Sequence, residues 1–293
     1  MRKSILKLSS ALGAAALMLF SCSSNSNGKL KIAATFAPIY DYVARIAGDK
    51  AEIINVVGEN EPHEFSLNDA RSMGFIEKAD LLFAYGHNID QWADGLNQSA
   101  YRNVTEGVRF KADDGVEDPH AWLSIECAKS MARNVARAIS EKDPANKEYY
   151  EKNLESLLES YDGLDAKYKE TLLGKTTSPY IVTSHEAFGY LASDYGLTQV
   201  GVNDIADHES TSARIAQVVD FIEEHEVKCI FLEELDSAGN IETVKSELSK
   251  RGYEIGYDVL SAYECATESG WKNGDDFVSV MEENLKVLAK WVA

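Results

Sequence analysis

The sequence is short of basic side chains. It has 293 residues with 29 Lys and Arg against 48 Asp and Glu, which gives a formal net charge of −19 at pH 7. Proteins that bind nucleic acids need a basic surface to neutralise phosphates, so this acidic excess argues against a nucleic-acid partner. Hydrophobic residues make up 45% of the chain, which is enough for a substantial core and argues against wholesale disorder.

Cysteine is also scarce, with four residues in the chain. No two of them are spaced as Cys-x-x-Cys, which argues against a zinc site built from paired cysteines. Cys229 and Cys265 share the second half of the chain, and they are the pair that we expect to bridge in an exported protein. Free, buried thiols at Cys127, Cys229 and Cys265 are an equally good interpretation.

The apolar run near the N-terminus is too short for a convincing transmembrane helix. It covers residues 11–20 and follows three basic residues, which is the pattern of an export signal. The run ends in Leu-Phe-Ser-Cys22, and this resembles a bacterial lipoprotein signal, in which Cys22 becomes the lipidated first residue of the mature chain. We therefore expect a signal peptide over residues 1–21 and a polar tether over 22–28. An ordinary signal peptide with an incidental cysteine is the alternative.

Short apolar runs that are typical of buried strands alternate with helical patterns in both halves of the chain. The expected strands cover residues 29–35, 52–57, 81–85, 180–183, 229–232 and 254–257. Strands that alternate with helices at this spacing predict βα units and parallel sheets. We find no linker rich in Gly, Pro or Ser between the two halves.

The middle of the chain, residues 143–173, has a different pattern. Apolar side chains recur there at steps of three and four: Tyr150, Leu154, Leu157, Leu158, Tyr161, Leu164, Tyr168 and Leu172. This spacing predicts one amphipathic helix of roughly 25 residues, about 38 Å long. The predicted fold is α/β, with parallel-sheet lobes over residues 29–142 and 174–293 joined by this helix. A helix packed inside a single domain is the alternative.

Four dispersed side chains are candidate metal ligands: His63, His120, His185 and Asp258. Each follows a strand-like run, and open α/β sheets bind ligands beyond the carboxyl ends of their strands. The first two histidines each follow a proline, which stiffens the loop and orients the imidazole. We expect two ligands from each lobe to hold one divalent cation in the cleft. An imidazole-rich, four-coordinate set suits Zn²⁺, whereas Mn²⁺ prefers more oxygen.

A single histidine at a strand end is more often a surface or hydrogen-bonded residue than a ligand, and three other histidines compete for the role. His87 occupies a similar strand end and is not excluded by its spacing. His208 lies in an acidic loop and could be an accessory group. His225 follows two glutamates near the end of a helix, and we expect it to face solvent.

Four stretches together resemble the metal-binding solute receptors of zinc and manganese ABC importers. They are residues 58–65 (GENEPHEF), 118–123 (DPHAWL), 183–190 (TSHEAFGY) and 230–233 (IFLE). The resemblance covers essentially the whole mature chain and implies two α/β lobes joined by one long helix. It also implies a ligand set of His63, His120, His185 and Asp258, with Glu233 as the alternative fourth ligand. The third ligand of this set, His185, is a histidine, and in this respect the chain is similar to zinc-type receptors.

The resemblance implies a monomeric, extracytoplasmic, lipid-anchored receptor. Such a receptor captures Zn²⁺, or alternatively Mn²⁺, and delivers it to a membrane permease that an ATPase powers. The His-rich loop of some zinc receptors is missing, because residues 64–80 contain no histidine. A zinc-dependent hydrolase with a three-histidine site is an alternative, but neither HExxH nor G-x-S-x-G is present. A surface adhesin on the same scaffold is a third interpretation.

Overall fold

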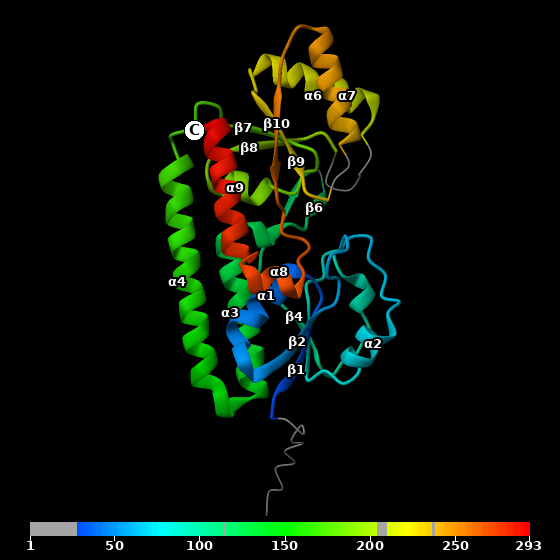
Figure 1. Cartoon of the computed structure of the whole chain (residues 1–293), viewed down its shortest axis with the longest axis vertical. Helices are drawn as coiled ribbons and strands as arrows, with labels where there is room; N and C mark the ends of the chain where they lie inside the picture. The colour runs from blue at the N-terminus through cyan, green and yellow to red at the C-terminus, as the bar shows by residue number, and fades with distance from the viewer. Residues whose placement is uncertain (1–27, 114, 204–209, 236–237) are drawn as a thin grey trace, which may run out of the picture.

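The structure, a computed structural model, describes residues 28–113, 115–203, 210–235 and 238–293 (Figure 1). The expected signal peptide, Cys22 and His208 lie outside the described residues. None of the helices in the described part of the chain is both long enough and apolar enough to cross a membrane.

The first lobe contains a parallel sheet of four strands in the order β2-β1-β3-β4. Its strands are β1 (Leu30–Ala34), β2 (Ala51–Asn55), β3 (Leu81–Ala84) and β4 (Tyr101–Asn103). The helices of this lobe are α1 (Ala37–Ala47), α2 (Ala70–Ile76) and α3 (Ile125–Lys142). All four residues of β3 are buried, as its continuous apolar run predicts.

The second lobe contains another four-stranded parallel sheet, in the order β10-β9-β7-β8. Its strands are β7 (Tyr180–Thr183), β8 (Thr198–Gly201), β9 (Cys229–Glu233) and β10 (Gly256–Leu260). Its helices are α5 (Gly189–Asp194), α6 (Ser212–Glu224) and α7 (Gly239–Lys250). The two parallel sheets and the alternating helices confirm the predicted fold class.

Short elements complete the first lobe and its connections. Two strands, β5 (Lys111–Asp113) and β6 (Val116–Asp118), form an antiparallel hairpin. The 3₁₀ turns are η1 (Gly48–Lys50), η2 (Gln91–Ala93), η3 (Ala121–Leu123) and η4 (Pro144–Asn146).

Helix α4 (Lys147–Leu172) has 26 residues and extends along both lobes (Figure 1). At 1.5 Å per residue it is about 39 Å long, which confirms the predicted long helix. It buries one face, and the buried residues are Tyr150, Leu157, Tyr161, Leu164, Tyr168 and Leu172. The helix begins at Lys147 because residues 144–146 form a 3₁₀ turn that starts at a proline.

After β10 the chain returns to the first lobe. The indole Nε1 of Trp122 donates a hydrogen bond to the carbonyl of Ala262 (2.8 Å), and the backbone N–H of Ala266 donates to the carbonyl of Gly58 (3.1 Å). The short helix α8 (Glu268–Asn273) lies against α1 (Figure 1). Residues 174–293, which the sequence predicts to form the second lobe, therefore include a segment after β10 that packs on the first lobe.

The last helix, α9 (Phe277–Val292), leads from the first lobe back to the second and runs parallel to α4 (Figure 1). The hydroxyl of Tyr168 donates to the carbonyl of Met281 (2.6 Å), and the Tyr161 ring contacts the Phe277 ring. Three segments thus connect the lobes: α4, the chain after β10, and α9. One buried cluster contains residues of both lobes and of these connecting helices, so the lobes share a core.

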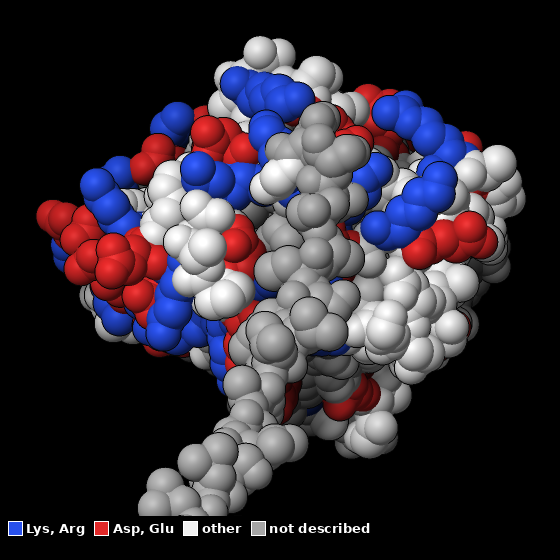
Figure 2. Space-filling view, turned by 90° about the horizontal axis from the view of Figure 1, so that it is seen from below, with Lys and Arg blue, Asp and Glu red and all other residues white. Residues whose placement is uncertain are grey.

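The lower end of the molecule, where β1 begins, carries basic and acidic side chains side by side (Figure 2). Two of the ion pairs of this lobe are Lys31–Glu52 (3.8 Å) and Lys142–Asp80 (3.8 Å). Although the net charge of the chain is negative, the surface at this end is a mixture of acidic and basic side chains.

Candidate metal centre

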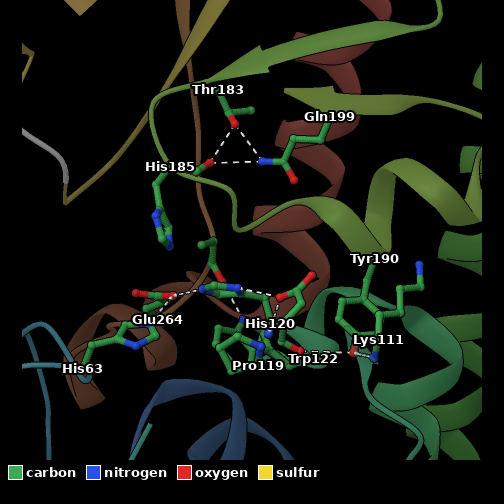
Figure 3. Close-up of polar contacts among 12 residues, drawn as sticks. His63, Lys111, Pro119, His120, Trp122, Thr183, His185, Tyr190, Gln199 and Glu264 are labelled. Atoms are coloured by element: carbon green, nitrogen blue, oxygen red, sulfur yellow. Dashed lines mark hydrogen bonds and ion pairs between the residues drawn. The ribbon is translucent and has the colours of Figure 1, made fainter. Parts of the chain in front are cut away.

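Three histidines and one glutamate converge between the two lobes (Figure 3). His63 lies in the loop after β2, His120 between β6 and η3, His185 just after β7, and Glu264 in the segment after β10. The ring centroids of His63 and His120 are 5.5 Å apart, and those of His120 and His185 are 5.2 Å apart. The three predicted histidines are thus brought together.

The spacing of the ligand atoms suits a tetrahedral metal ion. Glu264 Oε1 lies 3.4 Å from His63 Nε2 and 3.5 Å from His120 Nε2. Two atoms that are each bound to a tetrahedral zinc ion at about 2.0–2.1 Å lie about 3.3–3.4 Å from each other. Glu264 therefore stands at nearly the separation from each histidine that one shared zinc ion requires, and the ligand atoms of all three residues lie within 4.8 Å of one another.

The site is buried, and one ring nitrogen of His120 has no hydrogen-bond partner among the described residues. His120, His185 and Glu264 are each 2% exposed or less, and the side chain of His63 is 18% exposed. Within the described residues, His120 Nε2 makes no hydrogen bond. Buried polar atoms in native proteins nearly always have a partner, and a metal ion between these side chains supplies one.

The charges of the site favour a cation as well. Burial alone would raise the pKa of Glu264, but the hydrogen bond from His63 and the nearby imidazoles hold this pKa below its usual value. Burial alone would lower the pKa of His63, but the hydrogen bond and charge of Glu264 raise it. The metal-free site thus retains an ionised carboxylate and favours a proton on His63, which a divalent cation can replace.

Loop contacts hold the backbone at His120 and His185. Asp118 Oδ1 accepts hydrogen bonds from the backbone N–H and from Nδ1 of His120 (2.9 and 2.8 Å). The carbonyl of His185 accepts hydrogen bonds from Thr183 Oγ1 (2.6 Å) and Gln199 Nε2 (3.0 Å), as Figure 3 shows.

The prediction that Asp258 joins the histidines is wrong. Its carboxylate accepts hydrogen bonds from Lys290 Nζ (2.8 Å) and Trp291 Nε1 (2.9 Å), and these hold its pKa below the usual value. The physical reason is the length of β10, which continues past Asp258 to Leu260. Asp258 therefore lies within the strand and faces α9, and the carboxylate at the site is that of Glu264.

The alternative residues occupy other places. Glu233 is buried at the end of β9. Neither Glu233 nor His185 is a member of the tighter cluster that His63, His120 and Glu264 form, although the His185 ring lies 6.4 and 5.2 Å from the rings of His63 and His120. His87 stacks on Phe110 with a centroid separation of 3.6 Å, and its Nδ1 lies 2.5 Å from Glu117 Oε1.

His225, which the sequence predicts to face solvent, is partly exposed and partly packed against aromatic rings. Its ring is half-buried and contacts the rings of Tyr180 and Phe221 at 4.4 and 4.3 Å between centroids.

The expected bridge between Cys229 and Cys265 is not formed, since Cys127, Cys229 and Cys265 are all free. Cys229 begins β9 opposite Gly256, whereas Cys265 lies beyond the far end of β10. Because the two strands are parallel, Cys229 lies at the end of the sheet where the strands begin, and Cys265 lies beyond the end where they finish. A five-residue strand spans about 13–16 Å, and a disulfide needs Cα atoms within about 7 Å.

Glu264 was missed because it lies in an irregular segment rather than directly after a strand. The available signal was a glutamate four residues past an apolar strand in the second half of the chain. That signal is weak, since it becomes specific only when the contacts of the segment with the first lobe are known.

Comparisons with known proteins agree with this site and fold. The family model for the zinc-uptake complex component A, periplasmic (ZnuA), matches residues 32–291. The zinc-binding lipoprotein AdcA of Streptococcus pneumoniae serotype 4 is 32% identical over 93% of this chain and 58% of its own length. The manganese ABC transporter substrate-binding lipoprotein PsaA of Streptococcus mitis is 32% identical over 94% of this chain and 95% of its own.

A solved structure leads to the same family. The crystal structure of the Zn(II)-bound ZnuA-like domain of AdcA from Streptococcus pneumoniae has a TM-score of 0.74 and 32% sequence identity. The likeness covers 90% of this chain and 99% of that domain. This chain spans 58% of the length of full AdcA, so the activity of the whole AdcA protein is not carried over directly. The family match covers nearly all of the described residues and confirms the resemblance seen in the sequence. The chain belongs to the family of the zinc-uptake complex component A, periplasmic (ZnuA).

Proposed function

We propose that this protein is an extracytoplasmic solute-binding receptor that captures Zn²⁺ and delivers it to an ABC-type membrane permease. The observation that carries the proposal is the convergence of His63, His120, His185 and Glu264 between the lobes, with ligand atoms at 3.4–3.5 Å around Glu264. We assign these four side chains as the metal ligands, and the cation is the cargo.

Zinc is the preferred cargo because of the donor set. Three neutral imidazoles and one carboxylate give a charge of about +1 with a divalent ion and suit four-coordinate Zn²⁺. Mn²⁺ favours more oxygen ligands and higher coordination, so we expect it to bind more weakly. Manganese nevertheless stays the alternative cargo, since PsaA, a relative of similar identity, is named for a manganese transporter.

The number of protein ligands favours a receptor over a hydrolase. Catalytic zinc usually keeps three protein ligands and an open position for water. Here Glu264 lies with His63 and His120, and the ring of His185 is 5.2 Å from that of His120, which supports four protein ligands rather than three. No feature in the described part of the chain favours a surface adhesin over a transport receptor.

The proposed setting follows from the sequence and the family. Residues 1–21 would be removed, Cys22 would carry the lipid anchor, and the monomeric receptor would meet a permease and its ATPase outside the cytoplasm. Release would rely on local loop shifts or permease contact, because the shared core and three connecting segments resist large lobe movements.

The experiment is metal analysis of the chain purified without residues 1–21, followed by titration of Zn²⁺ and Mn²⁺ against a chelating dye. We expect one zinc ion per chain. His120→Ala should weaken zinc binding by roughly 100-fold or more, because it removes a buried ligand. The matched control is His225→Ala, which removes an imidazole remote from the site and should leave zinc affinity unchanged. A wild-type chain without stoichiometric zinc would falsify the proposal.

A further inference from the structure

Asp118 lies at the end of β6 and is buried beside the metal centre. One oxygen, Oδ1, accepts both the backbone N–H (2.9 Å) and the ring Nδ1 (2.8 Å) of His120. The loop is itself fixed, because the carbonyl of Asp118 accepts a hydrogen bond from the Tyr190 hydroxyl (3.2 Å), and the carbonyl of Pro119 accepts one from the Tyr85 hydroxyl (2.6 Å). The carboxylate and the imidazole are therefore held in one arrangement before any metal arrives.

The chemistry of this contact selects one tautomer of His120. A carboxylate accepts hydrogen bonds and does not donate them, so the proton of the neutral imidazole must sit on Nδ1. The lone pair then belongs to Nε2. That atom lies 3.5 Å from Glu264 Oε1 and makes no hydrogen bond within the described residues. The nitrogen left to bind a metal is thus the one that points at the other ligands (Figure 3).

We propose that Asp118 is a positioning residue for zinc capture, which fixes the ring orientation and tautomer of His120 so that Nε2 is ready to bind. This inference rests on the proposed function of the site. Carboxylates that hold a ligating imidazole by its other nitrogen typically contribute about 10–100-fold to metal affinity.

Gly189, the first residue of α5, leaves the space that Asp118 needs. A Cβ atom added at Gly189 would lie 2.9 Å from Asp118 Oδ2, so the carboxylate would have to move. The backbone of Gly189 is not in the left-handed region, which means that alanine is otherwise acceptable there. Gly189→Ala therefore displaces the carboxylate without changing its chemistry.

Asparagine at position 118 is the conservative replacement. Two N–H donors of His120 converge on Oδ1, so an amide would place its oxygen there and its NH₂ at the Oδ2 position. On that side Asp118 borders a surface pocket of about 410 Å³, which Lys111, Gly189 and Gln199 also line. The NH₂ group can thus find water, and the Asp118→Asn variant should retain the tautomer of His120.

The experiment has two readouts on wild type, Asp118→Ala, Asp118→Asn and Gly189→Ala. The first is long-range ¹⁵N NMR of the His120 ring in metal-free protein at mildly alkaline pH. The second is zinc affinity from chelator competition. Asp194→Asn is the control, since Asp194 lies on the same helix as Gly189 and accepts a hydrogen bond from Ser124 instead.

We expect a protonated Nδ1 and a bare Nε2 in wild type and in Asp118→Asn, with zinc affinities within about threefold of each other. Asp118→Ala should mix the tautomers and weaken zinc binding about 10–100-fold, and Gly189→Ala should weaken it in the same direction. A wild-type tautomer and affinity in both Asp118→Ala and Gly189→Ala would overturn the proposal. If Asp118→Ala does not fold, Gly189→Ala alone decides.

The two proposals fail differently. If wild type bound no zinc, the proposed function would fall, yet the NMR readout on metal-free protein would still decide whether Asp118 sets the tautomer. If wild type bound zinc and the variants matched it, only the role of Asp118 would fall.

Discussion

Glu264 reaches the histidines because the chain turns sharply at the residue before it. Tyr263 has a φ of 56°, in the left-handed region that side chains other than glycine rarely adopt. Its ring is buried and contacts Phe277, so packing holds this conformation. A strained backbone at a ligand is a common sign of a functional constraint, and here it aims the carboxylate into the site.

The identity of the fourth ligand gives the first prediction. Glu264→Gln keeps the shape of the side chain but removes the charge that balances the cation, so zinc affinity should fall roughly 10–100-fold. Asp258→Asn is the matched control and should stay within about threefold of wild type, because Asp258 is bound to Lys290 and Trp291. Chelator competition measures both. The opposite ranking of the two variants would restore Asp258 as the ligand.

The three histidines could be predicted from the sequence, and the carboxylate could not. Each histidine stands within a recognisable local stretch, next to a strand or behind a proline. The place of Glu264 depends instead on contacts between residues far apart in the chain, such as Trp122 with Ala262 and Gly58 with Ala266. Periodicity and spacing carry no information about such contacts and favour Asp258 instead, whose position within strand β10 keeps it away from the site.

Helix α4 is stabilised mainly by the side chains of its buried face, and its exposed positions contribute less. Gly163 lies on the exposed side, and a Cβ added there would meet no atom within 4 Å. Gly163→Ala should therefore stabilise the protein by about 0.5–1 kcal/mol, because alanine loses less conformational freedom in a helix. Urea unfolding of the zinc-free protein measures this. Zinc affinity should not change, and a loss of stability would contradict the description of this position.

The segment that carries Glu264 is anchored to α1 by a buried charge. Asp41 is fully buried and accepts hydrogen bonds from Arg45 (3.1 Å) and Trp271 Nε1 (2.5 Å), while Arg45 also pairs with Asp276 (2.6 Å). Burial raises the pKa of Asp41. The pair thus links the first lobe to α8 and to the start of α9.

Removal of this anchor gives a prediction at the same scale. Asp41→Ala leaves a half-buried Arg45 with one partner fewer and an indole N–H without its acceptor, so it should cost about 3 kcal/mol of unfolding free energy. Lys169→Ala breaks a solvent-screened surface pair with Asp165 and should cost much less than Asp41→Ala. Denaturant unfolding measures the loss of unfolding free energy in each variant. Equal losses in Asp41→Ala and Lys169→Ala would show that Asp41 does not anchor this segment.

The long elements of the fold were predictable, and the short ones were not. The three- and four-residue spacing in residues 147–172 is repeated over many turns, which makes the helix unmistakable. The β5–β6 hairpin has strands of three residues each, too short to show an alternating pattern. The return of α8 to the first lobe likewise leaves no periodic signal in the sequence.

For the molecule as a whole, the shared core and the three connections restrict how far the lobes can part. Three of the proposed ligands, His63, His120 and Glu264, are held on the first lobe or by contacts with it, and His185 comes from the second. We infer that zinc binding fastens the loop of His185 to a largely preformed set of three ligands, rather than closing two equal halves.

Small-angle scattering of metal-free and zinc-loaded protein tests this picture. The radius of gyration should be nearly the same in both states, while zinc should raise the thermal midpoint because it binds the folded chain. Zinc at 100 times its dissociation constant contributes about 2.7 kcal/mol. His120→Ala at the same zinc concentration is the control for the thermal shift. A large compaction on zinc binding would contradict a stiff connection between the lobes.

The path of the chain also sets the order in which the protein can be assembled during synthesis. All three histidines and both sheets leave the ribosome before residue 261 does. Yet Ala262, Tyr263 and Phe277 belong to the same buried cluster as Ile32 and Tyr42 of the first lobe. A growing chain therefore has neither Glu264 nor a finished first-lobe core until residues 262–277 have been made. If the proposed ligands hold zinc, zinc affinity should therefore appear only after residues 262–277 have folded onto the first lobe.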